Sequence, residues 1–90
     1  MSILKVSIRQ VKAARALLGW SQEDLAIKAD VSLPTIKRLE ALDGALGGRA
    51  DTISKIQEAL VTAGIIFLEG NGEGPGVCLR RRQRGTSKRD

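Results

Sequence analysis

The sequence of 90 residues predicts one mainly α-helical domain that ends in a β-hairpin. Apolar residues recur at helical spacing in four segments between residues 8 and 63, and serines or glycines stand at several of the segment ends. After residue 64 the apolar period changes from 3.6 to 2, which is typical of strands. A chain of this length buries one modest core and no large cavity.

Residues 1–7 alternate weakly and predict an N-terminal arm, which is either loose or a short strand. Residues 8–18 predict the first helix, with Ser7 as a candidate N-cap. Gly19 follows as the positive-φ residue that ends a helix and lets the chain turn back.

Residues 22–40 predict two short helices around a tight corner. Ser21 can cap the first helix, and Asp24 can reach back to it in a short capping box. Ser32 can cap the second helix, and Pro34 lies in its first turn, where no backbone N–H is needed. Only about three residues join the helices, so this unit is a helix-turn-helix.

The two short helices face each other through small and branched apolar residues, namely Leu25, Ala26, Ala29, Ile36 and Leu39. The outer face of the second helix is left with Leu33, Pro34, Lys37, Arg38 and Ala41. A helix with such an outer face, carrying two cations, can enter the major groove of double-stranded DNA.

The segment resembles the helix-turn-helix of the XRE/Cro-like phage-repressor family over residues 8–63. The resemblance is carried by Gln22-x-x-Leu25-Ala26-x-x-Ala29-x-Val31-Ser32-x-x-Thr35-Ile36-x-x-Leu39-Glu40, preceded by Arg15-Ala-Leu-Leu-Gly19-Trp20-Ser21. It implies a lambda-repressor-like domain of four to five helices that binds double-stranded DNA, usually as a homodimer, in transcriptional control. Two departures stand out: Asp30 replaces the usual turn glycine, and no last helix is visible after residue 64.

The second helix of the motif supplies the candidate base contacts. Lys37 and Arg38 can donate to guanine O6 and N7, and Leu33 or Pro34 can lie against a thymine methyl. The resemblance implies base reading at the positions of Leu33, Pro34 and Arg38. The expected base-contacting residues are Leu33, Pro34, Thr35, Lys37 and Arg38.

Three residues are expected to contact phosphate. The resemblance implies this role for Gln22, at a helix N-terminus that favours an anion. Ser32 lies at the start of the next helix, near a phosphate or a base edge. Arg49 ends a glycine-bearing loop, residues 41–49, whose counterpart in the family follows the DNA backbone.

The resemblance also implies a structural ion pair between Arg15 and Glu40, which would fix the second helix of the motif against the first helix of the domain. The alternative is that each residue is a solvated surface charge.

Residues 50–63 predict the fourth helix, and residues 64–80 predict a hairpin with a wide glycine-rich turn. One face of the hairpin can cover the helical core. The other face lacks a partner, so we expect residues 64–80 to form a homodimer contact. The expected contact residues are Ile65, Ile66, Phe67, Leu68, Val77 and Leu79.

The positive charge of the chain lies at its C-terminal end. Residues 1–79 contain nine basic and nine acidic residues, whereas residues 80–90 contain six basic and one acidic residue and supply the whole net charge of +5. Residues 81–90 have no apolar anchor and are expected to be disordered without DNA. This tail either adds phosphate contacts or only aids solubility, and the sequence favours neither.

Composition argues against catalysis and metal binding. The chain has no His, one Cys and no paired carboxylates on a defined face, so we expect no enzyme activity, metal or cofactor. Cys78 fits a small packed or interface side chain better than a redox sensor. No signal peptide or membrane-spanning run is visible, which favours a cytoplasmic protein away from membranes.

These patterns favour a dimeric repressor of an inverted-repeat operator, of the kind that often controls phages or other mobile elements in the family it resembles. The alternative is a protein-interaction module, such as an antitoxin or antiactivator, whose hairpin and tail bind another regulatory protein while DNA binding is secondary. RNA binding is disfavoured because Trp20 and Phe67 are better used in packing than in base stacking.

Overall fold

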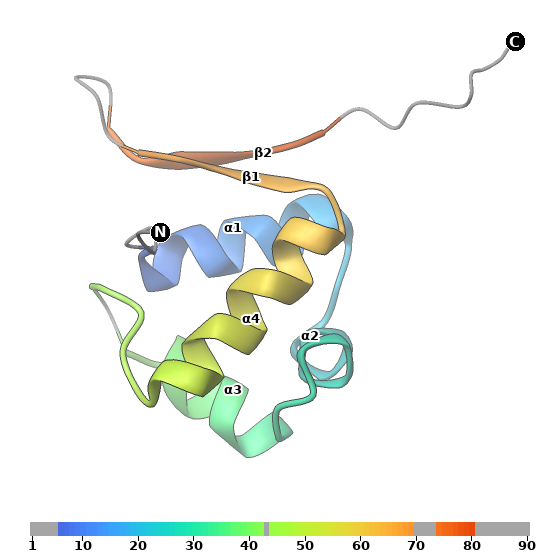
Figure 1. Cartoon of the computed structure of the whole chain (residues 1–90), viewed down its shortest axis with the longest axis vertical. Coiled ribbons are helices and arrows are strands. Elements are labelled where there is room, and N and C mark those ends of the chain that lie inside the picture. Colours follow the sequence, from blue (N-terminus) through green and yellow to red (C-terminus); the bar gives the residue numbers. More distant parts are fainter. Residues whose placement is uncertain (1–5, 43, 70–73, 81–90) are drawn as a thin grey trace, which may run out of the picture.

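The computed structural model describes residues 6–42, 44–69 and 74–80. It confirms a mainly α-helical domain with a C-terminal hairpin (Figure 1). Most of the N-terminal arm and the tail of residues 81–90 lie outside the described residues. The elements are α1 (Ile8–Leu18), α2 (Gln22–Ala29), α3 (Leu33–Glu40), α4 (Ala50–Thr62), β1 (Ile65–Leu68) and β2 (Gly76–Leu79).

The helix ends follow the capping pattern of the sequence. Ser21 accepts from the backbone N–H of Asp24, whose carboxylate accepts from the Ser21 N–H, and Ser32 accepts from the N–H of Thr35. Asp30 ends α2 in the left-handed region at φ 58°, where the family usually has glycine. Asp tolerates this conformation better than most residues, so the sharp corner between α2 and α3 is kept.

The start of the described chain is held by the loop that follows α3. The N–H of Ile8 donates to the carbonyl of Gly44, the N–H of Leu46 donates to the carbonyl of Val6, and Ser7 forms an isolated bridge with Ala45. The expected arm is therefore anchored at its last two residues, in short antiparallel contact with the loop.

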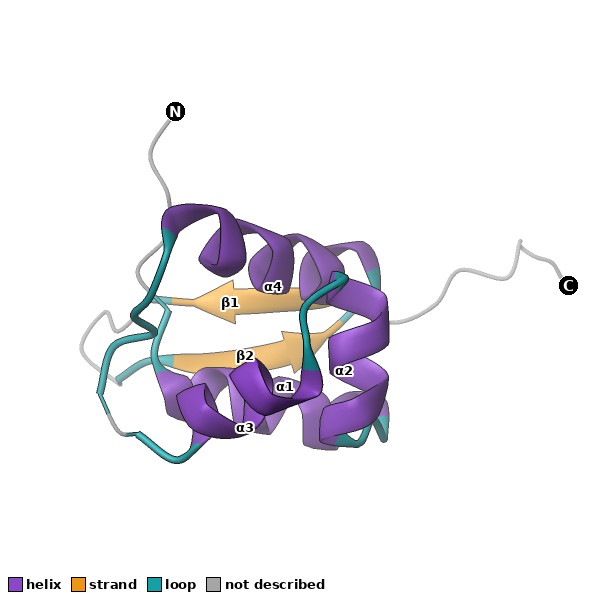
Figure 2. Ribbon diagram, turned by 90° about the horizontal axis from the view of Figure 1, so that it is seen from below, coloured by secondary structure: helices purple, strands orange, loops and turns teal. Residues whose placement is uncertain are grey.

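The hairpin forms a separate layer on the helices. β2 lies against α1 and β1 against α4, whereas α3 lies on the opposite side of α1 and α4 (Figures 1 and 2). The strands are antiparallel, with Ile65 opposite Leu79 and Leu68 opposite Gly76. Because side chains alternate along a strand, Ile66, Leu68, Gly76 and Cys78 form the outer sheet face, which points away from the helices.

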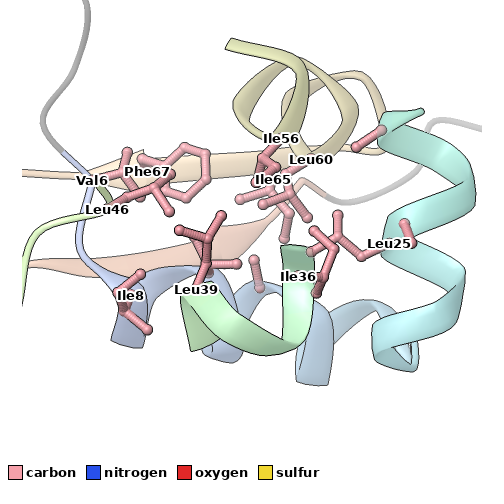
Figure 3. Packing of buried hydrophobic residues seen from close by; sticks show 14 residues of the cluster. Val6, Ile8, Leu25, Ile36, Leu39, Leu46, Ile56, Leu60, Ile65 and Phe67 are labelled. Carbon is pink, nitrogen blue, oxygen red and sulfur yellow. The ribbon is translucent and has the colours of Figure 1, made fainter. Parts of the chain in front are cut away.

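One hydrophobic core joins all these elements (Figure 3). Leu25 and Ile36 fill the contact between α2 and α3, and Ile56 and Leu60 lie between them and the sheet. The buried apolar residues are Val6, Ile8, Val11, Ala14, Leu25, Ala26, Ala29, Ile36, Leu39, Leu46, Ile56, Leu60, Ile65 and Phe67.

A buried amide, not predicted from the sequence, ties the hairpin to α1. The Nε2 of Gln10 donates to the carbonyls of Leu68, at 3.1 Å, and Gly76, at 2.9 Å. Its Oε1 accepts from the backbone N–H of Ser7 at 2.9 Å. Since Leu68 and Gly76 are opposite each other at one end of the ladder, this single side chain fixes that end of the sheet on α1.

Replacing Gln10 by Met should lower the free energy of unfolding by about 1–3 kcal/mol, because three backbone groups lose a buried partner. Urea unfolding followed by the fluorescence of Trp20, the single tryptophan, measures this change. As a control, Ala13→Met on the exposed side of α1 should stay within about 0.5 kcal/mol of the parent. Equal stability of the two variants would contradict the role of the amide.

Candidate nucleic-acid interface

The exposed surface of α3 gathers most of the residues expected to contact bases. Ile36, Leu39 and Glu40 point into the domain and are buried. The residues left exposed are Ser32, Pro34, Lys37, Arg38 and Ala41, which we call the α3 outer face. Its two cations stand on a helix whose other side is packed, so they can donate to phosphate oxygens or guanine edges without the helix being reordered.

Two of the residues expected to contact bases are less exposed to solvent than the sequence suggested. Leu33 is half-buried and packs against the core, so only part of its side chain is available to a base. Thr35 is also half-buried, and its hydroxyl lies 2.8 Å from the hydroxyl of Ser32. These two hydroxyls therefore stabilise the start of α3 in addition to any contact with DNA.

The C-terminal end of α3 is held by the ion pair expected from the family resemblance. Arg15 on α1 donates to both carboxylate oxygens of Glu40, from Nη2 at 2.7 Å and from Nε at 2.8 Å. The Glu40 side chain is 4% exposed and that of Arg15 is 19% exposed. A bidentate pair between a planar guanidinium and a carboxylate fixes orientation as well as distance.

The same pair reaches the start of α2. The Nη1 of Arg15 donates to the carbonyl of Trp20 at 3.0 Å, and the Nε2 of Gln22 donates to Glu40 Oε1 at 3.1 Å. Gln22, expected to contact phosphate, therefore uses one N–H inside the protein and retains a second N–H on the same nitrogen. We call Arg15, Trp20, Gln22 and Glu40 the helix lock, because they join α1, α2 and α3.

The helix lock keeps Glu40 ionised. Burial raises the pKa of its carboxyl group, but hydrogen bonds from Arg15 and Gln22 and the positive charges of Arg15 and Lys12 outweigh burial, so the pKa lies below its ordinary value of 4.5. The ionised form is the one that accepts all of these donors.

A polar hollow lies beside the α3 outer face, between α3 and the start of α4. It is lined by Thr35, Arg38, Leu39, Gly48, Arg49, Asp51 and Thr52. Arg49 precedes α4 without capping it through its side chain. The backbone N–H of Thr52 donates to Asp51 Oδ1 at 3.0 Å, and the other N–H groups of the first turn add to the positive potential there. The exposed carboxylate of Asp51 lies 3.5 Å from Arg49 Nε and opposes an anion in the hollow.

The hairpin residues expected at the homodimer contact divide between two environments. Ile65 and Phe67 are buried in the core of their own chain, and Val77 is half-buried against it. Ile66 and Leu68 are exposed on the outer sheet face. Leu79 is exposed at the end of β2, although it lies opposite Ile65.

Among the described residues, no group of three or more His, Cys, Asp or Glu is arranged to hold a metal ion. In the same part of the chain, none of the helices has the length and apolar character needed to span a membrane.

Comparison with known families gives a match to a helix-turn-helix model over residues 11–48. The matched segment runs from Val11 in α1 to Gly48 in the loop before α4. It therefore contains the helix lock and the α3 outer face. A search among curated proteins gave no match.

Replacing Arg15 by Met should lower the free energy of unfolding by about 3 kcal/mol, because the buried Glu40 carboxylate then lacks its main partner. The double replacement Arg15→Met with Glu40→Leu should restore much of the loss, because no unpaired buried charge remains. Urea unfolding at pH 7 measures both. A double variant no more stable than the single one would contradict the pairing.

The pH dependence of stability provides a second test of the helix lock. Since folding lowers the pKa of Glu40, its contribution is complete above about pH 4.5 and is lost as pH falls through the lowered value. Glu40→Gln should therefore reduce the fall in stability below pH 4.5. An unchanged acid profile would show that Glu40 is not the group responsible.

Proposed function

Because the chain is an XRE/Cro-like helix-turn-helix protein over residues 11–48 and a DNA-binding transcriptional regulator, we propose that it represses transcription by occupying an inverted-repeat operator. One copy would bind each half-site, with α3 in the major groove. The observation that carries the proposal is the α3 outer face, which presents Lys37 and Arg38 on a helix held at its C-terminal end by the helix lock.

Base reading would follow from the position of each side chain on α3. Arg38 and Lys37 are long and exposed, and they can reach guanine O6 and N7 in the groove. Pro34 is exposed in the first turn, where it can meet a thymine methyl. Thr35 and the exposed part of Leu33 would complete the contact by excluding water at the helix start.

Phosphate contacts on both sides of α3 would set its register on the duplex. The second N–H of Gln22 at the start of α2 and the hydroxyl of Ser32 are suited to one strand. The polar hollow, with Arg49 and the start of α4, is suited to a phosphate of the other strand. A phosphate there would displace Arg49 from Asp51.

The arrangement of two copies on one operator is limited by the position of the hairpin. Two copies on an inverted repeat are related by a twofold axis that leaves both α3 helices on the same side. The outer sheet face lies on the side opposite α3 (Figure 1). Stacking two such faces would direct the α3 helices away from each other, so we propose that half-site spacing, not this face, aligns the copies on one duplex.

Repression would be steric. Two copies with α3 about 34 Å apart occupy successive major grooves along one side of the duplex and exclude polymerase from that stretch. Occupancy would then depend on protein concentration and on competing partners.

A second candidate is a protein-interaction module, such as an antitoxin or antiactivator. It is favoured by one observation: the exposed apolar residues Ile66 and Leu68 lie away from α3, so another protein can bind there while DNA is bound. Loss of function on substitution in the outer sheet face, with no effect of substitution in α3, would support this candidate.

Selection from a pool of random duplexes tests the main proposal. The parent chain should enrich an inverted repeat with half-site centres about 10 base pairs apart. Arg38→Ala should weaken binding by about 1–3 kcal/mol and relax the preference at one base pair of each half-site. Lys55→Ala, an exposed cation on α4, serves as the control and should retain the preference. Enrichment of no sequence by the parent would refute sequence-specific binding.

Asp51→Asn should strengthen DNA binding by about threefold at low salt and less at high salt, because it removes the negative charge from the polar hollow and frees Arg49. Fluorescence anisotropy with one selected duplex at two salt concentrations measures the change. Glu58→Gln makes the same charge change at an exposed position further along α4 and should have little effect. Equal gains in the two variants would point to net charge rather than to the hollow.

A further inference from the structure

The free edge of β2 carries backbone groups without partners. Arg80 donates its N–H to the Gly64 carbonyl at 2.7 Å, one step beyond the pair of Ile65 and Leu79. Because hydrogen-bonded and non-hydrogen-bonded pairs alternate along an antiparallel ladder, Val77 and Leu79 turn their N–H and carbonyl groups away from β1. Among the described residues, these groups have no hydrogen-bond partner. We call the outward backbone groups of Val77 and Leu79 the β2 edge.

Exposed apolar side chains lie beside the β2 edge. Leu79 is opposite the buried Ile65, so its side chain leaves the sheet on the helix-facing side, yet it is 41% exposed. Leu17 is 47% exposed and lies two helical turns after Gln10, which binds the start of β2, so it is on the same side of α1. Since α1 and β2 run in the same direction (Figures 1 and 2), Leu17 and Leu79 lie at the same end of this layer.

The charge around the β2 edge is positive. Neither α1 nor β2 contains an Asp or Glu, whereas α1 contains Arg9, Lys12 and Arg15. Arg80 directly follows β2, and strand alternation directs its side chain to the outer sheet face, on the same side as Cys78. Within the described part of the chain, the Arg80 side chain forms no ion pair. A partner at this edge therefore meets positive charge next to apolar surface.

We propose that the β2 edge binds an extended acidic segment of another protein, which adds a third antiparallel strand to the sheet. The antiparallel arrangement continues that of β1 and β2 and is the more stable ladder. Partner residues opposite Val77 and Leu79 exchange hydrogen bonds with them and point toward the helices, so they are apolar. The residues between them point to the outer sheet face beside Arg80, so they are acidic. This binding goes beyond the proposed function and does not depend on it.

The edge of β1 is less suited to such a partner. Its outward backbone groups belong to Ile65 and Phe67, whose side chains are already buried. The residue that follows β1 is Glu69, which would repel an acidic segment.

An acidic strand also fits the β2 edge better than a second copy or a nucleic acid does. The β2 strand of a second copy would bring no acidic residue to Arg80. A nucleic acid would neutralise Arg80 but would place a polyanion over Leu17 and Leu79. A strand of alternating apolar and acidic residues supplies backbone hydrogen bonds, apolar cover and negative charge together.

A labelled peptide Glu-Val-Glu-Val-Glu-Val-Glu tests the proposal by fluorescence anisotropy with the full chain in low salt. It should bind with a Kd below about 1 mM. N-methylation of its Val residues should weaken binding by about tenfold, because these residues face the β2 edge, whereas N-methylation of its Glu residues should stay within about threefold. Absence of binding, or equal effects of the two modifications, overturns the proposal.

Two substitutions of one residue locate the site on the chain. Leu79→Pro removes an outward N–H without removing a hydrogen bond to β1, and it should weaken peptide binding by about tenfold. Leu79→Ala retains the N–H and should weaken binding by about threefold. Circular dichroism verifies the fold. Equal binding by the two variants would overturn the proposal, and if Leu79→Pro does not fold, the N-methylated peptides decide.

Charge exchange tests the class of partner. Arg80→Glu should weaken binding of the Glu-Val peptide by about fivefold and should strengthen binding of the corresponding Lys-Val peptide by about the same factor. Lys55→Glu makes the same charge change at an exposed position on α4 and should alter neither. Equal responses of the two variants would show that net charge selects the peptide, which would overturn the acidic partner.

Two further measurements separate this site from DNA binding and from self-association. A selected duplex should not displace the peptide, because the sheet lies on the side of the domain opposite α3 (Figure 1). In sedimentation, the labelled peptide should travel with the chain. Displacement by the duplex, or a chain dimer that excludes the peptide, overturns the proposal. A chain that binds the peptide but no duplex would refute the proposed function alone.

Discussion

The bidentate contact between Arg15 and Glu40 fixes the end of α3 that carries Lys37 and Arg38. It joins α1 to the last residue of α3, and through Trp20 and Gln22 it reaches the start of α2. A helix of eight residues has little stability of its own. Its direction therefore comes from the burial of Ile36 and Leu39, from the Ser32 cap at its first turn and from this contact at its last. The direction of Lys37 and Arg38 follows from these three.

The exposed cations of α3 and the exposed apolar residues of the hairpin lie on opposite sides of α1 and α4. Cations, a glycine-containing loop and an uncapped helix start surround α3, which suits a polyanion. The outer sheet face carries Ile66 and Leu68 and suits a protein surface instead. Gln10 and Arg15 lie on the same helix and anchor the two sides, one to the hairpin and the other to α3.

Local signals in the sequence were sufficient for the helices, their caps and the existence of the hairpin, because Ser21, Ser32 and Gly19 act on neighbouring residues only. The Arg15–Glu40 contact came from family resemblance, since nothing in the spacing of two residues 25 apart implies a pair. Gln10 was missed because a polar residue in an amphipathic helix is normally solvated. The alternation of β1 indicated that the strand has two faces. It did not indicate that Ile65 and Phe67 face the core, or that the sheet lies opposite α3, because both depend on tertiary packing.

Gln10 and Arg15 secure the two sides of the domain through different atoms and different neighbours, so a substitution on the surface of one side does not disturb the anchor of the other. Substitutions at Ile66, Leu68 or Cys78 alter the outer sheet face and leave the orientation of Arg38 untouched. Exchanges at Pro34, Lys37 or Arg38 alter the α3 outer face and leave the hairpin in place. The surface of α3 and the surface of the hairpin can therefore be changed independently of each other.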